Sequence, residues 1–159
     1  MINWKKINAR YFEKFIYHML GFEGFRNIDW YGRGGGDQGR DVTCTTYEEL
    51  PFGLGYERKW VFQCKKWSRM PSQGDIYNEC AKAKIHNPDF WVMAIPVDAS
   101  ANMIDYFKNL GESFGFKVVL IPLVKLEEML YKYPDLLQVL ETGELPNVGG
   151  VNEYAKSGI

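Results

Sequence analysis

The sequence has little cysteine and no long hydrophobic run. Its three cysteines, Cys44, Cys64 and Cys80, are too few and too scattered for a disulfide scaffold or a CxxC zinc site. The longest apolar run, around residues 90–97, is far shorter than the roughly 18 residues needed to cross a bilayer. The amphipathic N-terminus also lacks the apolar core of a signal peptide. We therefore expect a soluble protein of the cytoplasm with no membrane partner.

The chain also lacks an excess of charge of one sign. Its net charge is −1 at pH 7, so bulk charge alone does not attract it to nucleic acid. The charge is unevenly distributed, because residues 1–86 carry 14 Lys or Arg against 10 Asp or Glu, whereas residues 87–159 carry 5 against 10. This asymmetry fits a molecule with one side facing an anionic partner, although small patches of either sign occur on most proteins.

The composition is that of one ordinary globular domain. Of the 159 residues, 46% are hydrophobic and 25% are charged, which excludes a wholly disordered chain. We expect the domain to cover residues 1–148, followed by a tail or linker stub at residues 149–159. The apolar periodicity predicts helices at residues 8–20, 72–86, 99–114, 124–131 and 134–140, and strands within residues 22–30, 41–46, 59–64, 90–96 and 116–121.

This order of elements predicts an α/β fold. A mixed central sheet flanked by helices, in the order αβββαβαβα, is the natural packing of the pattern. The continuous apolar runs at residues 90–96 and 116–121 suit strands that are buried on both faces.

Three separate pieces of the sequence carry groups suited to phosphodiester chemistry. Glu13 lies in the first helix, Asp41 begins one strand, and Gln63 and Lys65 end the next. Alternate residues of a strand share a face, so Gln63 and Lys65 project together, and a hairpin would bring the Asp41 carboxylate to them. Oxygen ligands of this kind suit Mg²⁺, and the lysine could orient a water or stabilise developing charge. The pattern indicates metal-assisted phosphodiester hydrolysis.

Each of these residues also has a structural interpretation when considered alone. Asp41 would serve as a strand-start carboxylate bonded to backbone amides. Gln63 and Lys65 would be outward residues of an ordinary edge strand, which the lysine protects from aggregation. Glu13 would be a solvated residue on the polar side of a helix. Asp37, in the Gly-rich segment, is better explained by bonds to its own backbone than as a ligand. The combination of these residues favours the chemical interpretation.

The motifs resemble a known family. The string GGGDQGRDVTC at residues 34–44, followed by FQCKKW at residues 62–67, is similar to the Mrr-like restriction endonuclease domain of the PD-(D/E)xK nuclease superfamily. In that family a Gly-rich loop precedes the metal-binding aspartate, the second motif reads Gln-x-Lys, and the first helix contributes the glutamate of a Phe-Glu pair, here at residues 12–13. The resemblance covers residues 8–130.

The resemblance implies a Mg²⁺-dependent endodeoxyribonuclease, with Mn²⁺ as a substitute, of the type IV restriction kind that acts in antiviral defence. Asp41 would bind the metal through its carboxylate, together with the amide oxygen of Gln63 and the backbone carbonyl of Cys64. Lys65 would be the catalytic lysine, and Glu13 would hold a metal-bound water or a second ion. The chain departs from the family in the 15 residues at positions 45–59, which we expect to form an additional loop over the site.

Basic and aromatic residues surround the second motif. Lys66, Arg69 and Trp67, together with Arg40, are the candidates for DNA contacts, whereas Trp60 is better explained as a core residue. A single nuclease lobe rarely recognises a specific DNA sequence by itself. We therefore expect a homodimer or a fusion to a recognition or NTPase module. Two alternatives stay open, a catalytically silent nuclease-fold module that only binds nucleic acid, and an unrelated doubly wound domain.

Overall fold

The computed structural model describes residues 2–32 and 40–146. The expected loop residue Asp37 and the expected tail at residues 149–159 lie outside the described residues. The α-helices are α1 (Ala9–Phe22), α2 (Gln73–Ala83), α3 (Ala101–Phe114), α4 (Leu123–Lys132) and α5 (Leu136–Thr142), and the strands are β1 (Arg26–Trp30), β2 (Val42–Glu49), β3 (Gly55–Cys64), β4 (Phe90–Ala94) and β5 (Lys117–Ile121). Within the described part of the chain, no helix is long and apolar enough to span a membrane.

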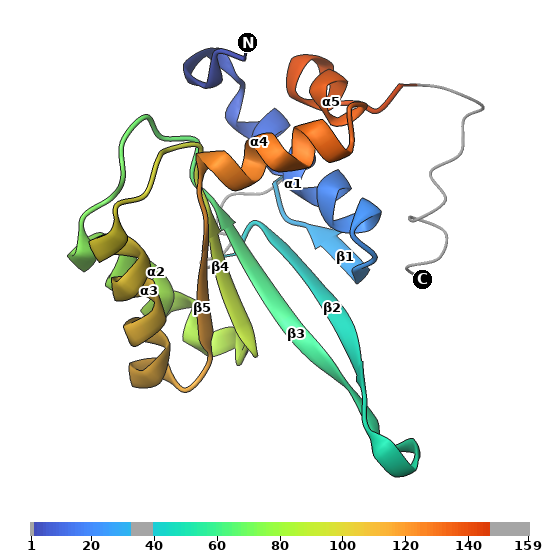
Figure 1. The fold of residues 1–159 in the computed structure, drawn as a ribbon, viewed down its shortest axis with the longest axis vertical. Helices are drawn as coiled ribbons and strands as arrows, with labels where there is room; N and C mark the ends of the chain where they lie inside the picture. Colours follow the sequence, from blue (N-terminus) through green and yellow to red (C-terminus); the bar gives the residue numbers. More distant parts are fainter. Residues whose placement is uncertain (1, 33–39, 147–159) are drawn as a thin grey trace.

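The five strands form one mixed sheet in the order β1-β2-β3-β4-β5. The first three strands are antiparallel neighbours, and β3, β4 and β5 are parallel. Parallel neighbours require a crossover, and α2 and α3 supply the two crossovers (Figure 1). The structure confirms the expected α/β class with a mixed, helix-flanked sheet.

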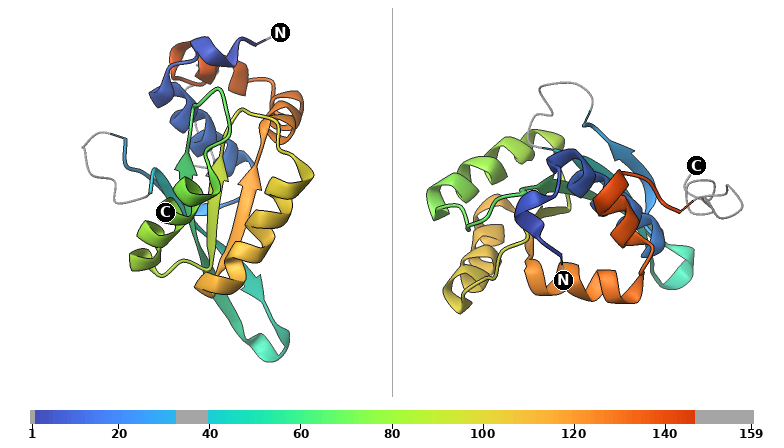
Figure 2. Two further views of the ribbon diagram at one scale, coloured as in Figure 1. Left: turned by 90° about the vertical axis from the view of Figure 1, so that its left-hand side faces the viewer. Right: turned by 90° about the horizontal axis from the view of Figure 1, so that it is seen from above.

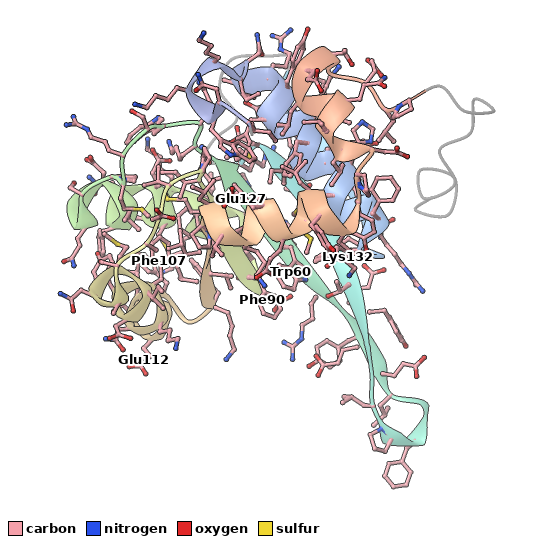
Figure 3. The ribbon with its side chains drawn as sticks, turned by 45° about the horizontal axis from the view of Figure 1, so that its top comes forward. Trp60, Phe90, Phe107, Glu112, Glu127 and Lys132 are labelled. Atoms are coloured by element: carbon pink, nitrogen blue, oxygen red, sulfur yellow. The ribbon has the colours of Figure 1, made fainter. Side chains whose placement is uncertain are left out.

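The sheet separates two hydrophobic layers (Figure 2). On one face, Phe12 and Ile16 of α1 pack with Phe62 of β3, and this cluster continues to Leu126 of α4. On the other face, the core is formed by α2, α3 and the opposite sides of β3, β4 and β5. Near the start of β4, the stacked rings of Trp60 and Phe90 lie 3.9 Å apart (Figure 3). Trp60 therefore packs against the core, as expected.

Polar side chains cap the first turns of α1, α2 and α3. The Asn8 side chain accepts hydrogen bonds from the backbone amides of Arg10 and Tyr11 at the start of α1. Ser72 and Ser100 cap α2 and α3 in the same manner. Such caps satisfy amides that have no partner within the helix, and they fix the position of α2 beside the end of β3.

One expectation about the strands is wrong, and another holds only in part. Residues 45–59 do not form a loop over the site, because β2 and β3 stay paired from Val42 opposite Phe62 to Glu49 opposite Gly55. Continuous pairing carries these residues away from Asp41, so the hairpin points to the other end of the sheet (Figure 1). In addition, β5 is the outer strand of the sheet and is only partly buried, because no further strand pairs with it among the described residues.

Candidate active site

Asp41 lies where β2 begins, beside the end of β3. Its Oδ2 accepts a hydrogen bond from the backbone amide of Cys64 at 2.7 Å, and its own amide donates to the carbonyl of Phe62 at 2.8 Å. The residue is only 6% exposed. These bonds bring the carboxylate to the end of β3, as the sequence predicts. The strand-start interpretation is also correct in part, because a backbone amide does bind the carboxylate.

Gln63 is a buried polar residue whose carbonyl oxygen lacks a partner. The residue is 6% exposed, and among the described residues its Oε1 accepts no hydrogen bond. Phe62 and Cys64 pack on the α1 face of the sheet, so Gln63 projects to the α2 face. A buried oxygen without a partner carries a free-energy cost, which a further group bound at that oxygen would remove.

Lys65 follows β3 and reaches the side of α2. Its Nζ lies 3.2 Å from Oε1 of Glu79, and both side chains are largely buried. The ammonium also lies 5.2 Å from the ring centre of Trp67. A cavity of about 260 Å³ adjoins this pair, and Lys65, Trp67 and Glu79 are among the residues that line it. Sequence reasoning missed Glu79, although it directly precedes the buried Cys80 in α2.

Glu13 lies on the α1 side of the sheet. Its Oε1 accepts a hydrogen bond from the indole Nε1 of Trp30 at 2.9 Å. Trp30 pairs with Val42, the neighbour of Asp41 in the chain. The structure therefore brings Asp41, Gln63 and Lys65 together at the end of β3, whereas Glu13 is connected to them through Trp30.

The four candidate DNA contacts differ in their surroundings. The Arg40 guanidinium lies 4.2 Å from the ring centre of Tyr31, and its Nη1 lies 3.4 Å from Nδ1 of His86. Lys66 donates to the carbonyl of Lys5 at 2.7 Å. Trp67 and Arg69 are exposed. Arg40 and Lys66 thus make contacts within the fold, and the other two present their side chains to solvent.

The donor set fits a hard divalent cation better than a soft one. Nowhere in residues 2–32 and 40–146 do three or more His, Cys, Asp or Glu side chains form a group able to hold a metal. The buried carboxylate of Asp41 and the unpartnered amide oxygen of Gln63 are hard oxygen donors. Mg²⁺ is typically bound through one or two carboxylates and retains several waters, so this pair fits it.

Comparison with solved structures defines the class of fold. The MspJI restriction endonuclease in complex with a 27-mer oligonucleotide is similar to this chain, with a TM-score of 0.51 and 18% sequence identity. The match covers 92% of this chain and 32% of that chain, so this chain spans about a third of the enzyme's length. At this identity the likeness establishes the fold, which is that of a restriction endonuclease. No curated protein matches the chain.

A family model makes the assignment more specific. The model described as restriction endonuclease (Mrr_cat) matches residues 4–87, more than half of the chain. The chain therefore belongs to the restriction endonuclease family, which confirms the resemblance inferred from the motifs. The matched range includes Glu13, Asp41, Gln63 and Lys65.

Proposed function

We propose that this chain is a metal-dependent DNA endonuclease whose reacting groups lie at the end of β3. The observation that carries the proposal is the buried Oε1 of Gln63, which has no partner among the described residues, next to Cys64, whose amide binds the Asp41 carboxylate. Burying the polar side chains of Asp41 and Gln63 costs free energy that two apolar side chains of the same size would not cost. A function that uses the oxygens of both side chains explains why they are present. Family membership supports the same activity.

In this proposal, Asp41, Gln63 and the backbone carbonyl of Cys64 would hold Mg²⁺, for which Mn²⁺ would substitute. When bound, the metal supplies Lewis-acid polarisation of the scissile phosphate. The Cys64 amide fixes the orientation of the Asp41 carboxylate through their 2.7 Å hydrogen bond. Lys65 places its ammonium beside the phosphate, where it stabilises the negative charge that develops as water adds to phosphorus and the ester oxygen leaves.

Glu79 is the positioning residue of this arrangement. Its carboxylate lies 3.2 Å from the Lys65 ammonium, and so keeps that long side chain on the α2 face. Glu13 would act from the α1 side through the position of Trp30. The exposed Trp67 and Arg69 would contact the DNA, the tryptophan by stacking and the arginine through phosphates.

Cleavage of supercoiled plasmid DNA tests the proposal. We expect nicking or linearisation with Mg²⁺ or Mn²⁺, no cleavage with EDTA, and loss of roughly 10²-fold or more of the rate in Asp41→Asn and Lys65→Ala. The matched controls are Asp105→Asn and Lys125→Ala, which change exposed residues on α3 and α4. Cleavage that persists in both site variants would refute the assignment of these residues.

The second candidate function is a module that binds DNA without cutting it. The observation in its favour is that the described residues contain no cluster of three acidic, His or Cys ligands. It predicts that the wild-type protein shifts DNA in a gel and leaves plasmid intact with every divalent metal tested.

The biological role completes the proposal. A defence nuclease of the type IV restriction kind would act on foreign DNA in the cytoplasm. It would act either as a homodimer with two sites or with a fused recognition or NTPase module. A strain that expresses the active protein would then restrict phage infection, and the Lys65→Ala strain would not.

A further inference from the structure

The hairpin of β2 and β3 extends beyond the rest of the sheet. Pairing with β1 ends at Thr45, and pairing with β4 begins at Trp60. Residues 46–58, which we name the hairpin arm, therefore pair only with each other, and the arm projects from the body of the molecule (Figures 1 and 3). Its four paired positions beyond the sheet extend the tip by about 14 Å at 3.4 Å per residue.

The tip of the arm is apolar and exposed. Phe52 is 97% exposed and Leu54 is 62% exposed, and Leu50 lies beside them. Tyr47 and Tyr56, on the paired part of the arm, are also exposed. Scattered exposed apolar residues are ordinary, but a contiguous group at the end of a projecting element marks an interaction site.

The charges on the arm favour a protein partner over DNA. Glu48, Glu49 and Glu57 are acidic, and the nearby Arg58 binds Glu48 at 2.8 Å. Arg58 therefore does not offset the two other carboxylates. A surface that inserts into DNA needs cations to neutralise phosphates, and this arm presents carboxylates around its apolar tip.

The same chain carries a groove of complementary character along β5. The groove has a volume of about 780 Å³ and lies between β5 and α3, where Figure 3 labels Phe107 and Glu112. Its apolar lining includes Ile104, Phe107, Phe116 and Leu120. Lys108 and Lys117, which are exposed, also line it. The carboxylates of Asp89 and Glu112 lie there too, and Asp89 is 3.8 Å from Arg58.

We propose that the hairpin arm of one copy of this chain binds in the β5 groove of a second copy. The apolar tip would contact the apolar lining, and Glu49 and Glu57 would face Lys108 and Lys117. The length also fits, since the five residues of β5 span about 17 Å.

The geometry favours a reciprocal exchange of arms. Arg58 belongs both to the base of the arm and to the lining of the groove, so the two surfaces adjoin each other. A two-fold axis near Arg58 would let each arm bind in the other copy's groove, which closes the assembly as a dimer. This inference rests on the arm and the groove and does not depend on nuclease activity.

Sedimentation velocity over a range of protein concentrations tests the inference. We expect the wild-type protein to form dimers and Phe52→Asp to remain monomeric with an unchanged circular dichroism spectrum. The control is Tyr131→Asp, which adds the same charge at a 91% exposed residue of α4 and should still dimerise. A wild-type protein that is monomeric at every concentration, or a Phe52→Asp dimer, would overturn the proposal.

Charge reversal tests the groove itself. Lys108→Glu with Lys117→Glu should weaken the dimer, and adding Glu49→Lys with Glu57→Lys to this variant should restore it. Failure of the second pair to restore the dimer would refute the proposed contact between arm and groove. If Phe52→Asp instead weakens DNA binding and leaves the molecular mass unchanged, then the tip contacts DNA and the proposal is wrong.

Discussion

At the residue scale, Asp41 has a structural role in addition to the chemical role that we propose for it. Its Oδ2 accepts a hydrogen bond from the Cys64 amide in a nearly buried setting. Asp41→Ala leaves that amide without its partner, and we expect it to lower the free energy of unfolding by about 1–3 kcal/mol. Asp41→Asn retains an acceptor oxygen and should lose much less. Urea unfolding of both variants measures the difference, and equal losses would contradict this account.

His18 is a buried residue of α1, and it makes stability depend on pH. Burial lowers the pKa of His18 from 6.5 to about 4, which Glu144 partly offsets and Lys14 reinforces. Between these two values the unfolded chain binds more protons than the folded chain, so stability falls as the pH decreases from 6.5 to 4. The total loss is about 3 kcal/mol.

Urea unfolding at pH 7, 5.5 and 4.5 measures this dependence against His18→Gln. The difference between wild type and variant isolates the histidine, because the carboxylates titrate in both proteins. We expect that difference to shrink as the pH falls. A difference that stays constant with pH would show that His18 does not contribute to the acid sensitivity.

Sequence reasoning predicted which candidate residues lie close together at the ends of the neighbouring strands β2 and β3. Alternation along β3 and the start of β2 is a local property, and it placed Asp41, Gln63 and Lys65 correctly. Glu79 and Trp30 were not foreseen, because their contacts join elements that are far apart in the sequence. The spacing of residues along the sequence does not predict which carboxylate of α2 contacts Lys65 after β3.

At the element scale, the Asn8 cap determines how firmly α1 begins. The Asn8 side chain accepts hydrogen bonds from two backbone amides, at 2.8 and 3.3 Å. Asn8→Ala should lower the free energy of unfolding by about 1 kcal/mol, and Asn8→Asp should retain most of the stability. Thermal unfolding of the two variants checks this, and the idea fails if the aspartate is as destabilising as the alanine.

The hairpin shows why element lengths are harder to predict than element types. The segments at residues 41–46 and 59–64 were identified as strands, but the Pro and Gly residues between them suggested a loop. In the structure, the only break in the hairpin is the short turn around Pro51–Gly53, where Phe52 has a positive φ of 64°. In this part of the hairpin, polar and aromatic residues alternate, but neither face packs against a core. The alternation of hydrophobic residues that predicts a strand is therefore weak, and the paired strands beyond the sheet were missed.

At the scale of the whole molecule, the uneven charge predicts how binding depends on salt. The basic first half contains Arg69, which is exposed. Arg69 forms no ion pair with any other described residue. If Arg69 contacts a phosphate, Arg69→Ala should reduce the slope of log affinity against log salt by about one. Fluorescence anisotropy with a duplex at several salt concentrations measures the slope, and an unchanged slope would exclude this contact.

The overall architecture was predictable because the hydrophobic periodicity indicates the type and order of the helices and strands. The helix–strand order after residue 72 determines the two parallel crossovers, and a mixed sheet follows. The outer position of β5 was not predictable from its apolar run, because its side chains pack on both faces of the sheet, as those of an inner strand do. Composition does not indicate whether another strand pairs with its edge.

The central claim is that the oxygens of Asp41 and Gln63 bind a divalent metal beside Lys65. The most direct measurement is Mn²⁺ binding to the intact protein, followed through the electron paramagnetic resonance signal of the free ion. We expect one class of site whose affinity falls on the order of 10- to 100-fold in Asp41→Asn and Gln63→Leu. Lys65→Ala should retain the affinity, because the lysine is not a ligand. Equal Mn²⁺ affinity in the wild-type protein and Asp41→Asn would contradict the account.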